Sequence, residues 1–575
     1  MRKILKNKIF LYLTEFFAGM SVMAVELGAS RLMAPYFSSS QIVWTIIIGT
    51  IMIAMALGNI YGGKSADKNP DPDKLYLRVI VAAVWIALIP VIGKYVIILI
   101  SGVLVFTVNS NFLIIAAFAA CMIIFVFPLF LLGTVTPSLV KFTVDSLDDN
   151  GKTVGYLNAS NTIGSIIGTF VPTFVSIPAV GTSITFLIFS GVLLLLAVIY
   201  FMSKKDGEQS NGKKSKSTAT KVIAGIMIFA LCCCFGHNNT FAFWTDELTY
   251  EGESIYNYLQ VSEDDRKVAL STNVLFGVQS VYQKEAGLTG MYYDYAMAAP
   301  LMADIANKEK VDILILGMGT GTYATQCSRY FGNVESTGVE IDEKITELAR
   351  QYFELPETVE VTTYDGRAYL DSISQRYDVI MVDAYQDITI PFQMSSVEFF
   401  TSVRNHLKED GVMVVNMNMR GDTSEAVDAD VSDGSDAGNT PDSSEATINT
   451  YLADTIASVF TDVMTVDVAG CTNRELFASN NGDMLSVFEK NLGVISDGEY
   501  DCTQSADRNA ELAVMMQRVG ENLVTYKSKG YLMTDDKAPV ELLGMRMIDS
   551  IIADEVSIYK EIYEQQGFEG LMNAL

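Results

Sequence analysis

Histidine is nearly absent from this sequence, which contains only His237 and His406 among its 575 residues. With only two histidines, the sequence does not favour a histidine-based catalytic triad or a histidine metal site. The seven cysteines follow neither zinc-ligand spacing nor a disulfide framework, because Cys121 and the run 232–234 lie in apolar stretches and the others are scattered. We therefore expect no bound metal.

Basic residues are also scarce, with 40 Lys and Arg against 67 Asp and Glu and a net charge of −27. Their distribution is uneven: residues 1–244 carry 18 basic and 10 acidic residues, which leaves 22 and 57 for residues 245–575. Nucleic-acid binding depends on neutralising phosphates, so the acidic part excludes a nucleic-acid partner. Its charge fits either a cationic ligand or a merely soluble surface.

Hydrophobic residues make up half of the chain, and the mean hydropathy is +0.28. The first long apolar stretch exceeds the length of a cleaved signal peptide, so we expect it to anchor the chain. The composition predicts a multi-pass membrane domain over residues 1–221, and a seventh segment, 222–244, that either spans or lies at the interface. The six predicted spans, each long enough for about 30 Å of hydrocarbon, are 9–33, 42–63, 75–93, 111–134, 154–176 and 182–202.

Lysines mark the side of the membrane on which the loops lie. They precede the first span and follow the second, fourth and sixth, as the positive-inside rule requires for a cell-membrane protein with a cytoplasmic N-terminus. A spanning segment at 222–244 would place the acidic part outside the cytoplasm, whereas an interfacial one would keep it inside. The sequence leaves both arrangements open.

A βαβ unit begins at residue 311. The apolar strand Val311–Leu316 is followed by a glycine turn, the helix 323–330 and the strand 334–339, which ends at Glu340. Glycines let backbone N–H groups approach a ligand, and the acid at the end of the next strand can bind ribose hydroxyls. The turn is G-x-G-x-G with no basic residue for phosphate, which favours a cofactor of the adenosylmethionine type over a dinucleotide.

Two later strands also end in acids. The strand 359–363 leads to Asp365 and Gly366, and the strand 377–382 leads to Asp383. Parallel strands of a doubly wound sheet bring their carboxyl ends to one crevice. We expect the glycine backbone to hold the amino-acid-like end of the ligand, Glu340 the ribose, Asp365 the adenine amino group, and Asp383 to face the reacting centre.

The soluble part divides further. Segments 255–261, 268–270 and 278–282 alternate as strands of a small antiparallel sheet, and residues 292–305 form a helix. We predict an N-terminal β-sheet over 245–300 and an α/β, Rossmann-like domain over 301–575. Residues 421–444, rich in Asp, Ser, Gly and Thr, form a predicted disordered acidic insertion.

The segment 253–480 resembles spermidine synthase, the aminopropyltransferase family with a class I methyltransferase fold, and the whole chain resembles its membrane-fused bacterial form. The apolar part, with the loop 58–68, is similar to half of a major-facilitator transporter. The matching motifs are Glu253-Ser254-Ile255-Tyr256-Asn257, Val278-Gln279, Tyr292-Tyr293-Asp294, Val339-Glu340-Ile341-Asp342, Asp365-Gly366, Asp383-Ala384-Tyr385-Gln386-Asp387 and Thr534–Glu541.

The resemblance implies a co-substrate, decarboxylated S-adenosylmethionine, a polyamine acceptor and a homodimer. It makes Asp383 the catalytic base. The cofactor-binding residues it implies are Gly317, Gly319, Thr320, Gly321, Glu340, Ile341, Asp365, Gly366 and Asn257. The substrate-binding residues it implies are Gln279, Tyr292, Tyr293, Asp294 and Asp387.

The sequence departs from the family at four points. Thr320 replaces an Asp that helps to hold a cationic amine, Asn257 replaces Gln, Tyr293 replaces His or Gln, and one extra residue precedes Asp387. A neutral Thr320 is also compatible with a methyltransferase that uses intact S-adenosylmethionine. A third reading is a polyamine transporter or sensor without catalysis.

Overall fold

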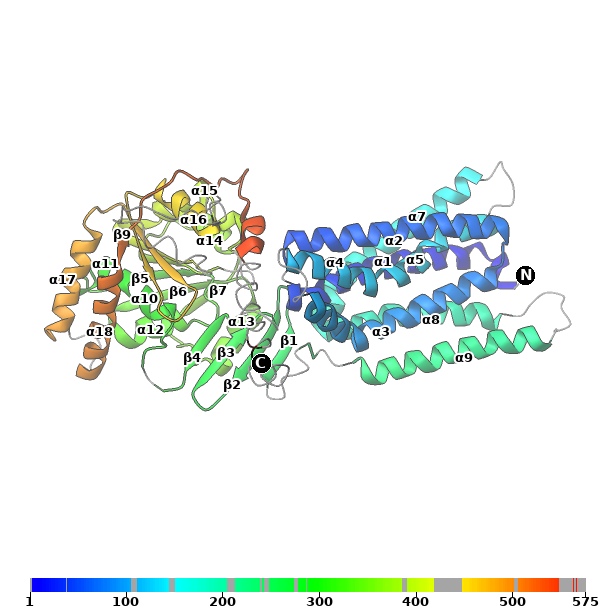
Figure 1. The fold of residues 1–575 in the computed structure, drawn as a ribbon, viewed down its shortest axis with the longest axis horizontal. Helices are drawn as coiled ribbons and strands as arrows, with labels where there is room; N and C mark the ends of the chain where they lie inside the picture. The colour runs from blue at the N-terminus through cyan, green and yellow to red at the C-terminus, as the bar shows by residue number, and fades with distance from the viewer. Residues whose placement is uncertain are drawn as a thin grey trace. The chain divides into compact units, whose positions relative to one another are not determined.

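The structure is a computed structural model. It describes residues 3–37, 39–104, 111–143, 150–203, 212–237, 240–241, 248–273, 278–285, 287–384, 390–417, 447–500 and 505–547, with 562 and 565. The predicted insertion 421–444 and Asp387 lie outside them. The contacts group the chain into two units (Figure 1). The helical unit comprises residues 1–246, 250–259 and 273–276, and the sheet unit comprises 247–249, 260–272 and 277–575.

Long apolar helices make up the helical unit. Six helical stretches of the described chain are long and apolar enough to cross a membrane, and one of them, Gly151–Met202, contains two predicted spans joined by the π-helical turn Pro172–Ser176. The predicted seventh stretch contains the helix Thr218–Phe235. The helices are α1 (Lys8–Phe37), α2 (Gln41–Lys68), α3 (Pro72–Leu104), α4 (Phe112–Ile124), α5 (Val126–Gly133), α6 (Val135–Thr143), α7 (Asn150–Val171), α8 (Ile177–Met202) and α9 (Gly212–Phe235).

Helices α1 and α7 pack backbone against backbone. A Cβ atom on Gly164 would lie 1.9 Å from the Phe16 carbonyl oxygen, and one on Gly168 would lie 2.1 Å from the Met20 carbonyl oxygen. Small residues at such positions allow close helix contact in apolar surroundings. Beside this contact the buried Glu15 accepts hydrogen bonds from Thr136 Oγ1 (2.5 Å) and Asn161 Nδ2 (2.8 Å).

A four-stranded sheet of order β1-β2-β3-β4 precedes the larger sheet. The predicted strand 255–261 begins only at Tyr258, because the Ser254 hydroxyl accepts hydrogen bonds from the backbone N–H groups of Tyr256 and Asn257 and turns the chain. The strand before that turn was not predicted. The strands are β1 (Leu248–Glu253), β2 (Tyr258–Glu263), β3 (Lys267–Ser271) and β4 (Ser280–Gln283).

The predicted helix 292–305 is two short helices, α10 (Tyr292–Ala296) and α11 (Ala298–Met302). Pro300 has no N–H group to donate to the carbonyl oxygen of Ala296, four residues earlier. That oxygen instead accepts a hydrogen bond from the Tyr323 hydroxyl at 3.3 Å. The break thereby ties α10 to the helix that follows the glycine turn.

The larger sheet has eight strands in the order β12-β10-β11-β9-β8-β5-β6-β7. Strands β5 to β9 are parallel along this order, and β10, β11 and β12 add to the edge as antiparallel strands. The doubly wound fold is therefore confirmed, with an antiparallel extension. Its strands are β5 (Val311–Leu316), β6 (Val334–Glu340), β7 (Glu360–Thr363), β8 (Tyr377–Val382), β9 (Leu407–Met417), β10 (Asp462–Asp467), β11 (Arg474–Ser479) and β12 (Val524–Thr525).

Chain order reverses direction in the sheet between β5 and β8, which is the topological switch point where such sheets bind ligands. The helices of this unit are α12 (Thr322–Tyr330), α13 (Glu343–Tyr352), α14 (Gly366–Ser372), α15 (Val397–Asn405), α16 (Ile448–Ala457), α17 (Met484–Ser496) and α18 (Ala506–Asn522). The helix predicted over 323–330 is thus observed as α12, which begins one residue earlier.

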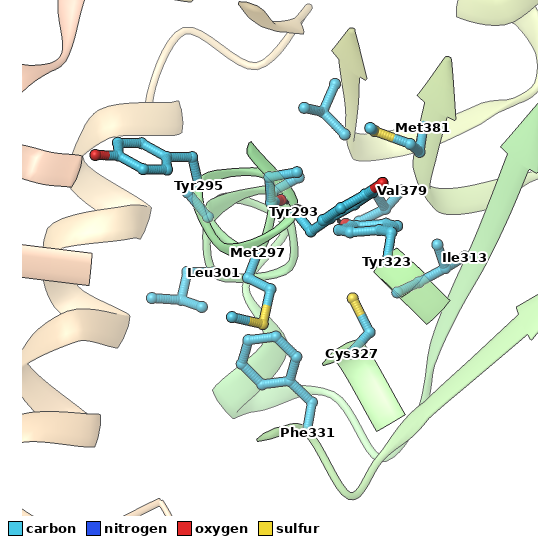
Figure 2. Close-up of a cluster of buried hydrophobic side chains, with 14 of the residues drawn as sticks. Tyr293, Tyr295, Met297, Leu301, Ile313, Tyr323, Cys327, Phe331, Val379 and Met381 are labelled. Atoms are coloured by element: carbon cyan, nitrogen blue, oxygen red, sulfur yellow. Dashed lines mark hydrogen bonds between the residues drawn. The ribbon is translucent and has the colours of Figure 1, made fainter. Parts of the chain in front are cut away.

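One apolar core lies between the sheet and helices α10, α11, α12, α17 and α18. Figure 2 shows side chains from β5 and β8, such as Ile313 and Met381, directed toward Tyr293, Tyr323 and Met297. Alternate residues of a strand face the same side. Asp383 and Asn416, two positions after the core residues Met381 and Val414, therefore face this side as well.

Asp378 is a buried carboxylate near the start of β8, at the end of the strand opposite to Asp383. It accepts hydrogen bonds from Lys308 Nζ (2.8 Å), Lys408 Nζ (2.7 Å) and the backbone N–H of Asp312 (2.8 Å). Burial opposes its ionisation, but the hydrogen bonds from the two lysines outweigh burial and lower the pKa of Asp378. The carboxylate thus stabilises the fold at neutral pH, and this contribution is lost as the pH falls through the lowered pKa.

We expect Asp378→Ala to lower the free energy of unfolding of the sheet unit by about 2–3 kcal/mol, because it leaves two lysines without a buried partner. Asp410→Ala is the matched control, since the more exposed Asp410 also pairs with Lys308 but should contribute less than about 1 kcal/mol. Pulse proteolysis of the full chain in detergent, in increasing urea, measures both. Equal losses for the two variants would contradict the assignment.

Candidate active site

The glycine turn lies at the switch point, against the end of β8. Gly317, Gly319 and Gly321 all have positive φ angles, of 80°, 56° and 78°. A Cβ atom on Gly317 would lie 2.4 Å from the Cα atom of Ala384. Only glycine fits there, and the absence of side chains on these glycines lets a ligand approach the backbone closely before α12.

Glu340 ends β6 beside this turn. Its carboxylate accepts hydrogen bonds from the backbone N–H groups of Gly319 (2.8 Å) and Asp342 (3.0 Å). Burial raises the pKa of Glu340 to about 7. Each carboxylate oxygen has a second lone pair, so Glu340 keeps the capacity to accept ribose hydroxyls. Ile341, the next residue, is partly exposed beside it.

Asp383 directly follows β8, and its backbone N–H donates to the Leu316 carbonyl oxygen at 2.9 Å. Its carboxylate accepts hydrogen bonds from the Tyr292 hydroxyl (2.6 Å) and from Asn416 Nδ2 (2.9 Å). Burial raises the pKa of Asp383 to about 7, although both donors favour the ionised form. A carboxylate with neutral donors and a pKa near neutrality is suited to accept a proton.

The paired tyrosines of α10 connect Asp383 to the small sheet. The rings of Tyr292 and Tyr293 lie 4.0 Å apart between centroids, and the Tyr293 hydroxyl donates to the Gln279 carbonyl oxygen at 3.2 Å. Burial and the charge of Asp383 raise the pKa of Tyr292 well above its usual value, so Tyr292 acts as a hydrogen-bond donor. Tyr292, Tyr293 and Gln279 are therefore brought together with Asp383.

Asp294 holds the loop before α10. Its carboxylate accepts hydrogen bonds from Thr289 N and Oγ1, Gly290 N and Gln326 Nε2, and its side chain is fully buried. We infer that Asp294 holds the two tyrosines that precede it, Tyr292 and Tyr293, in position. Its predicted contact with substrate stays a prediction.

Thr320 is buried in the glycine turn, where its hydroxyl lies 3.3 Å from the Thr322 hydroxyl. Asp365 accepts a hydrogen bond from the backbone N–H of Ala368 (2.8 Å), so it caps α14, which begins at Gly366. The backbone N–H of Tyr364 donates to the Glu340 carbonyl oxygen at 3.1 Å, which places the end of β7 beside the end of β6. The carboxyl ends of β5, β6, β7 and β8 therefore lie side by side at one edge of the sheet.

Two predicted site residues are not among the residues of the sheet unit that the structure describes. Asn257 lies in the segment 250–259, which groups with the helical unit, so its cofactor contact stays a prediction. Asp387 lies outside the described residues.

The sequence reasoning missed Asn416 and Glu475. Asn416 is the last but one residue of β9, and it also accepts a hydrogen bond from Asn473 Nδ2 at 2.8 Å. Residues 411–417 form an apolar stretch in the sequence, and applying the strand-end rule to this stretch would have identified Asn416. Glu475 lies within β11, and nothing in the sequence distinguishes it from a surface acid of an edge strand.

Among the described residues, no group of His, Cys, Asp and Glu is arranged to hold a metal ion. The donors at the crevice are carboxylates, tyrosine hydroxyls, an amide and glycine N–H groups. This set fits a cationic nucleoside and an amine, because the carboxylates match their positive charges and the glycine backbone leaves space beside them.

Comparisons with known proteins agree with this chemistry. Residues 291–469 match the family profile described as "Spermine/spermidine synthase domain". The "Probable polyamine aminopropyl transferase" of Bifidobacterium longum is 49% identical over 388 residues, which cover 66% of this chain and 78% of that protein. The "Polyamine aminopropyltransferase" of Oceanobacillus iheyensis is 28% identical over 207 residues, 34% of this chain and 38% of that protein.

A solved structure, the spermidine synthase from Thermotoga maritima, aligns with 47% of this chain and 82% of its own, with 18% identity and a TM-score of 0.34. The extent and identity of the Bifidobacterium match, together with the profile match over the crevice, decide the family. The chain belongs to the spermine/spermidine synthase family and is an aminopropyltransferase.

Proposed function

We propose that the sheet unit transfers an aminopropyl group from decarboxylated S-adenosylmethionine to a di- or polyamine. The Asp383 carboxylate is the observation that carries this proposal: it directly follows β8 at the switch point, and its donors among the described residues are the neutral Tyr292 and Asn416. The name of the Bifidobacterium relative supports the same reaction.

In the proposed reaction, the acceptor amine attacks the methylene carbon next to the sulfonium. A carbon–nitrogen bond forms, the carbon–sulfur bond breaks, and methylthioadenosine leaves with the electron pair. The proton of the attacking nitrogen passes to Asp383. Tyr292 and Asn416 keep the carboxylate oriented and ionised until that transfer.

The sulfonium of the donor activates the carbon that is attacked. The protein therefore has to bind both substrates, align them and remove a proton from the acceptor amine. We propose that the turn Gly317–Gly321 holds the donor through its backbone, with Glu340 on the ribose and Asp365 on the adenine amino group. Alignment of the amine with the carbon next to the sulfonium contributes the rest of the rate enhancement, beyond the part that comes from proton removal.

Asp383→Asn should lower kcat by about 100- to 10,000-fold, because the amide cannot accept the proton. The full chain in detergent is incubated with decarboxylated S-adenosylmethionine and a mixture of diamines, and the nucleoside product is identified by mass. Methylthioadenosine with a lengthened polyamine establishes the reaction, whereas adenosylhomocysteine formed from S-adenosylmethionine would mean methyl transfer.

The matched control is Asp371→Asn, which changes an exposed carboxylate of α14 and should keep full turnover. Methylthioadenosine should bind both variants as it binds the natural chain. Normal turnover by Asp383→Asn would remove Asp383 from the mechanism.

The pH dependence of kcat/KM follows from the ionisation of Asp383. Because only the carboxylate accepts a proton, activity should rise with pH up to the pKa of about 7 and level off above it. Tyr292→Phe removes a donor that favours the ionised form, so the acid limb should move up by about one pH unit. Tyr352→Phe, at the end of α13, is the control, and an unmoved limb in Tyr292→Phe would contradict the assignment.

We also propose that the helical unit is embedded in the cell membrane and that α9 crosses it. At one end of this unit the Ile4 backbone N–H donates to Ser203 Oγ (3.2 Å), and Lys141 pairs with Asp67 (3.0 Å). At the other end Tyr36 donates to the Phe241 carbonyl oxygen (2.9 Å). The chain thus leaves the helices at the end opposite to its N-terminus.

Lysines at the end of α2 (Lys64 and Lys68), the start of α3 (Lys74), the end of α6 (Lys141) and the start of α7 (Lys152) belong to the end that holds the N-terminus. The positive-inside rule places that end in the cytoplasm. We therefore propose that the sheet unit lies on the outer side, where both substrates would have to be present.

Labelling with a membrane-impermeant maleimide tests this orientation. Glu489→Cys, on the exposed face of α17, should react in intact cells, and Lys68→Cys, at the end of α2, should react only after permeabilisation. The chain with its natural cysteines gives the background. Labelling of Lys68→Cys alone in intact cells would reverse the proposed orientation.

A further inference from the structure

Glu475 is a buried acid that the proposed mechanism does not use. Its side chain is 0% exposed, and neither carboxyl oxygen has a hydrogen-bond partner in the described part of the chain. Burial of a carboxyl group without partners is costly, and native proteins retain such groups when they serve a purpose. Packing alone therefore does not explain why the Glu475 carboxyl group is buried.

Strand register places Glu475 in one row with the residues of the active site. Glu475 lies directly opposite Asn416 in the antiparallel pair of β11 and β9. Val415 pairs with Val382 in the next pair of strands, so Asn416 stands beside Asp383. Residues opposite each other on neighbouring strands face the same side. The Cα atoms of Glu475 and Asp383 are two strand spacings apart, roughly 10 Å.

The side that this row faces is covered by helices rather than by cations. Helices α10 and α12 contribute Tyr292, Tyr293, Tyr323 and Cys327 to the core on this side, and Figure 2 shows three of them directed into it. Each has a pKa raised by burial, so none carries a charge at neutral pH.

The neighbouring basic residue is also turned away. Arg474 precedes Glu475 in β11, so it faces the other side of the sheet, and it pairs with Asp467 at 2.7 Å. Burial and then the charge of Asp383 raise the pKa of Glu475 well above its usual value. Free enzyme thus holds an uncharged carboxyl group two strands from the base.

We propose that Glu475 is the counter-anion for a primary alkylammonium group of a substrate that reacts at Asp383. This inference rests on the proposed aminopropyl transfer. When the ammonium group binds, Glu475 releases its proton to solvent and forms an ion pair with it, and no bond of the substrate changes. The ammonium belongs either to the aminopropyl group of the donor or to the far end of the acceptor, and both have the same chemistry.

The test compares Glu475→Gln with the natural chain, at full length in detergent. Loss of a buried, hydrogen-bonded charge pair should raise the dissociation constant or KM of the bound amine about 100-fold, with a smaller change in kcat. If the donor supplies the ammonium, binding of decarboxylated S-adenosylmethionine weakens, whereas methylthioadenosine, which lacks the amine, binds unchanged. If the acceptor supplies it, the diamine KM rises and both nucleosides bind unchanged.

Proton release provides a second readout that a structural role would not change. Calorimetric titration of the amine in two buffers of different ionisation enthalpy should show about one proton fewer released by Glu475→Gln than by the natural chain. The thermal midpoint of the substrate-free variant should not fall, because the amide removes only an unpaired acid. Glu489→Gln, on the surface of α17, is the control for all measurements.

Unchanged constants for donor and acceptor, with unchanged proton release, would overturn the inference about Glu475. If Glu475→Gln does not fold, Glu475→Met provides a neutral, unbranched side chain of similar length for the same comparison. Failure of the natural chain to lengthen any amine would instead overturn the proposed function, so the two failures are distinguishable.

Discussion

The arrangement of this active site depends on partly burying one carboxylate, Asp383, without a positive partner among the described residues. Asp383 is hydrogen-bonded by Tyr292 and Asn416, and these neutral donors hold its orientation while burial raises its pKa to about 7. A lysine or arginine in their place would lower that pKa and weaken the base. Conversely, without donors the carboxyl group would stay protonated. The two neutral donors, Tyr292 and Asn416, therefore keep the pKa of Asp383 between these two limits.

The sheet supplies the positions for this balance. The reversal of strand order between β5 and β8 opens the crevice, and the short glycine turn Gly317–Gly321 lets the end of β8 come within contact of β5. Tyr292 reaches Asp383 because α10 ends early at Ala296 and packs across the sheet. The antiparallel strands β10 and β11 extend the same face and bring Glu475 into the row. One surface thus carries Asp383, which is the proposed base, its two hydrogen-bond donors and an additional acid.

The helical unit raises a different physical question, because its apolar helices suit a membrane while the sheet unit handles polar, cationic molecules. Closely packed glycines join α1 to α7, and Glu15 is held by hydroxyl and amide donors within the bundle. Both hydrogen bonds reach Glu15 Oε1, so this oxygen links α1 to α6 and α7. Among the described residues the second oxygen, Oε2, is buried without a hydrogen-bond partner.

Much of the architecture could be predicted from local pattern. Residue types at fixed spacing were enough to predict the long apolar stretches, the lysine-rich loops and the order of strand, glycine turn, strand and acid. They also identified the acids Glu340, Asp365 and Asp383. Such patterns depend only on the local backbone. Local pattern failed where a single side chain or missing N–H changed the backbone: Ser254 turned the chain before β2, and Pro300 divided one predicted helix into two.

The contacts between distant segments needed the tertiary structure. Tyr292, Asn416 and Asp383 are separated by up to 124 residues in the chain, and Glu475 belongs to their row only because an antiparallel strand returns beside β9 in one particular register. Register and packing are set by the whole core, not by neighbours in sequence. The sequence by itself therefore determined the apolar character of the N-terminal helices, the fold class and the acids at the strand ends. The tertiary structure decided which groups surround Asp383, because only folding places those side chains on one face.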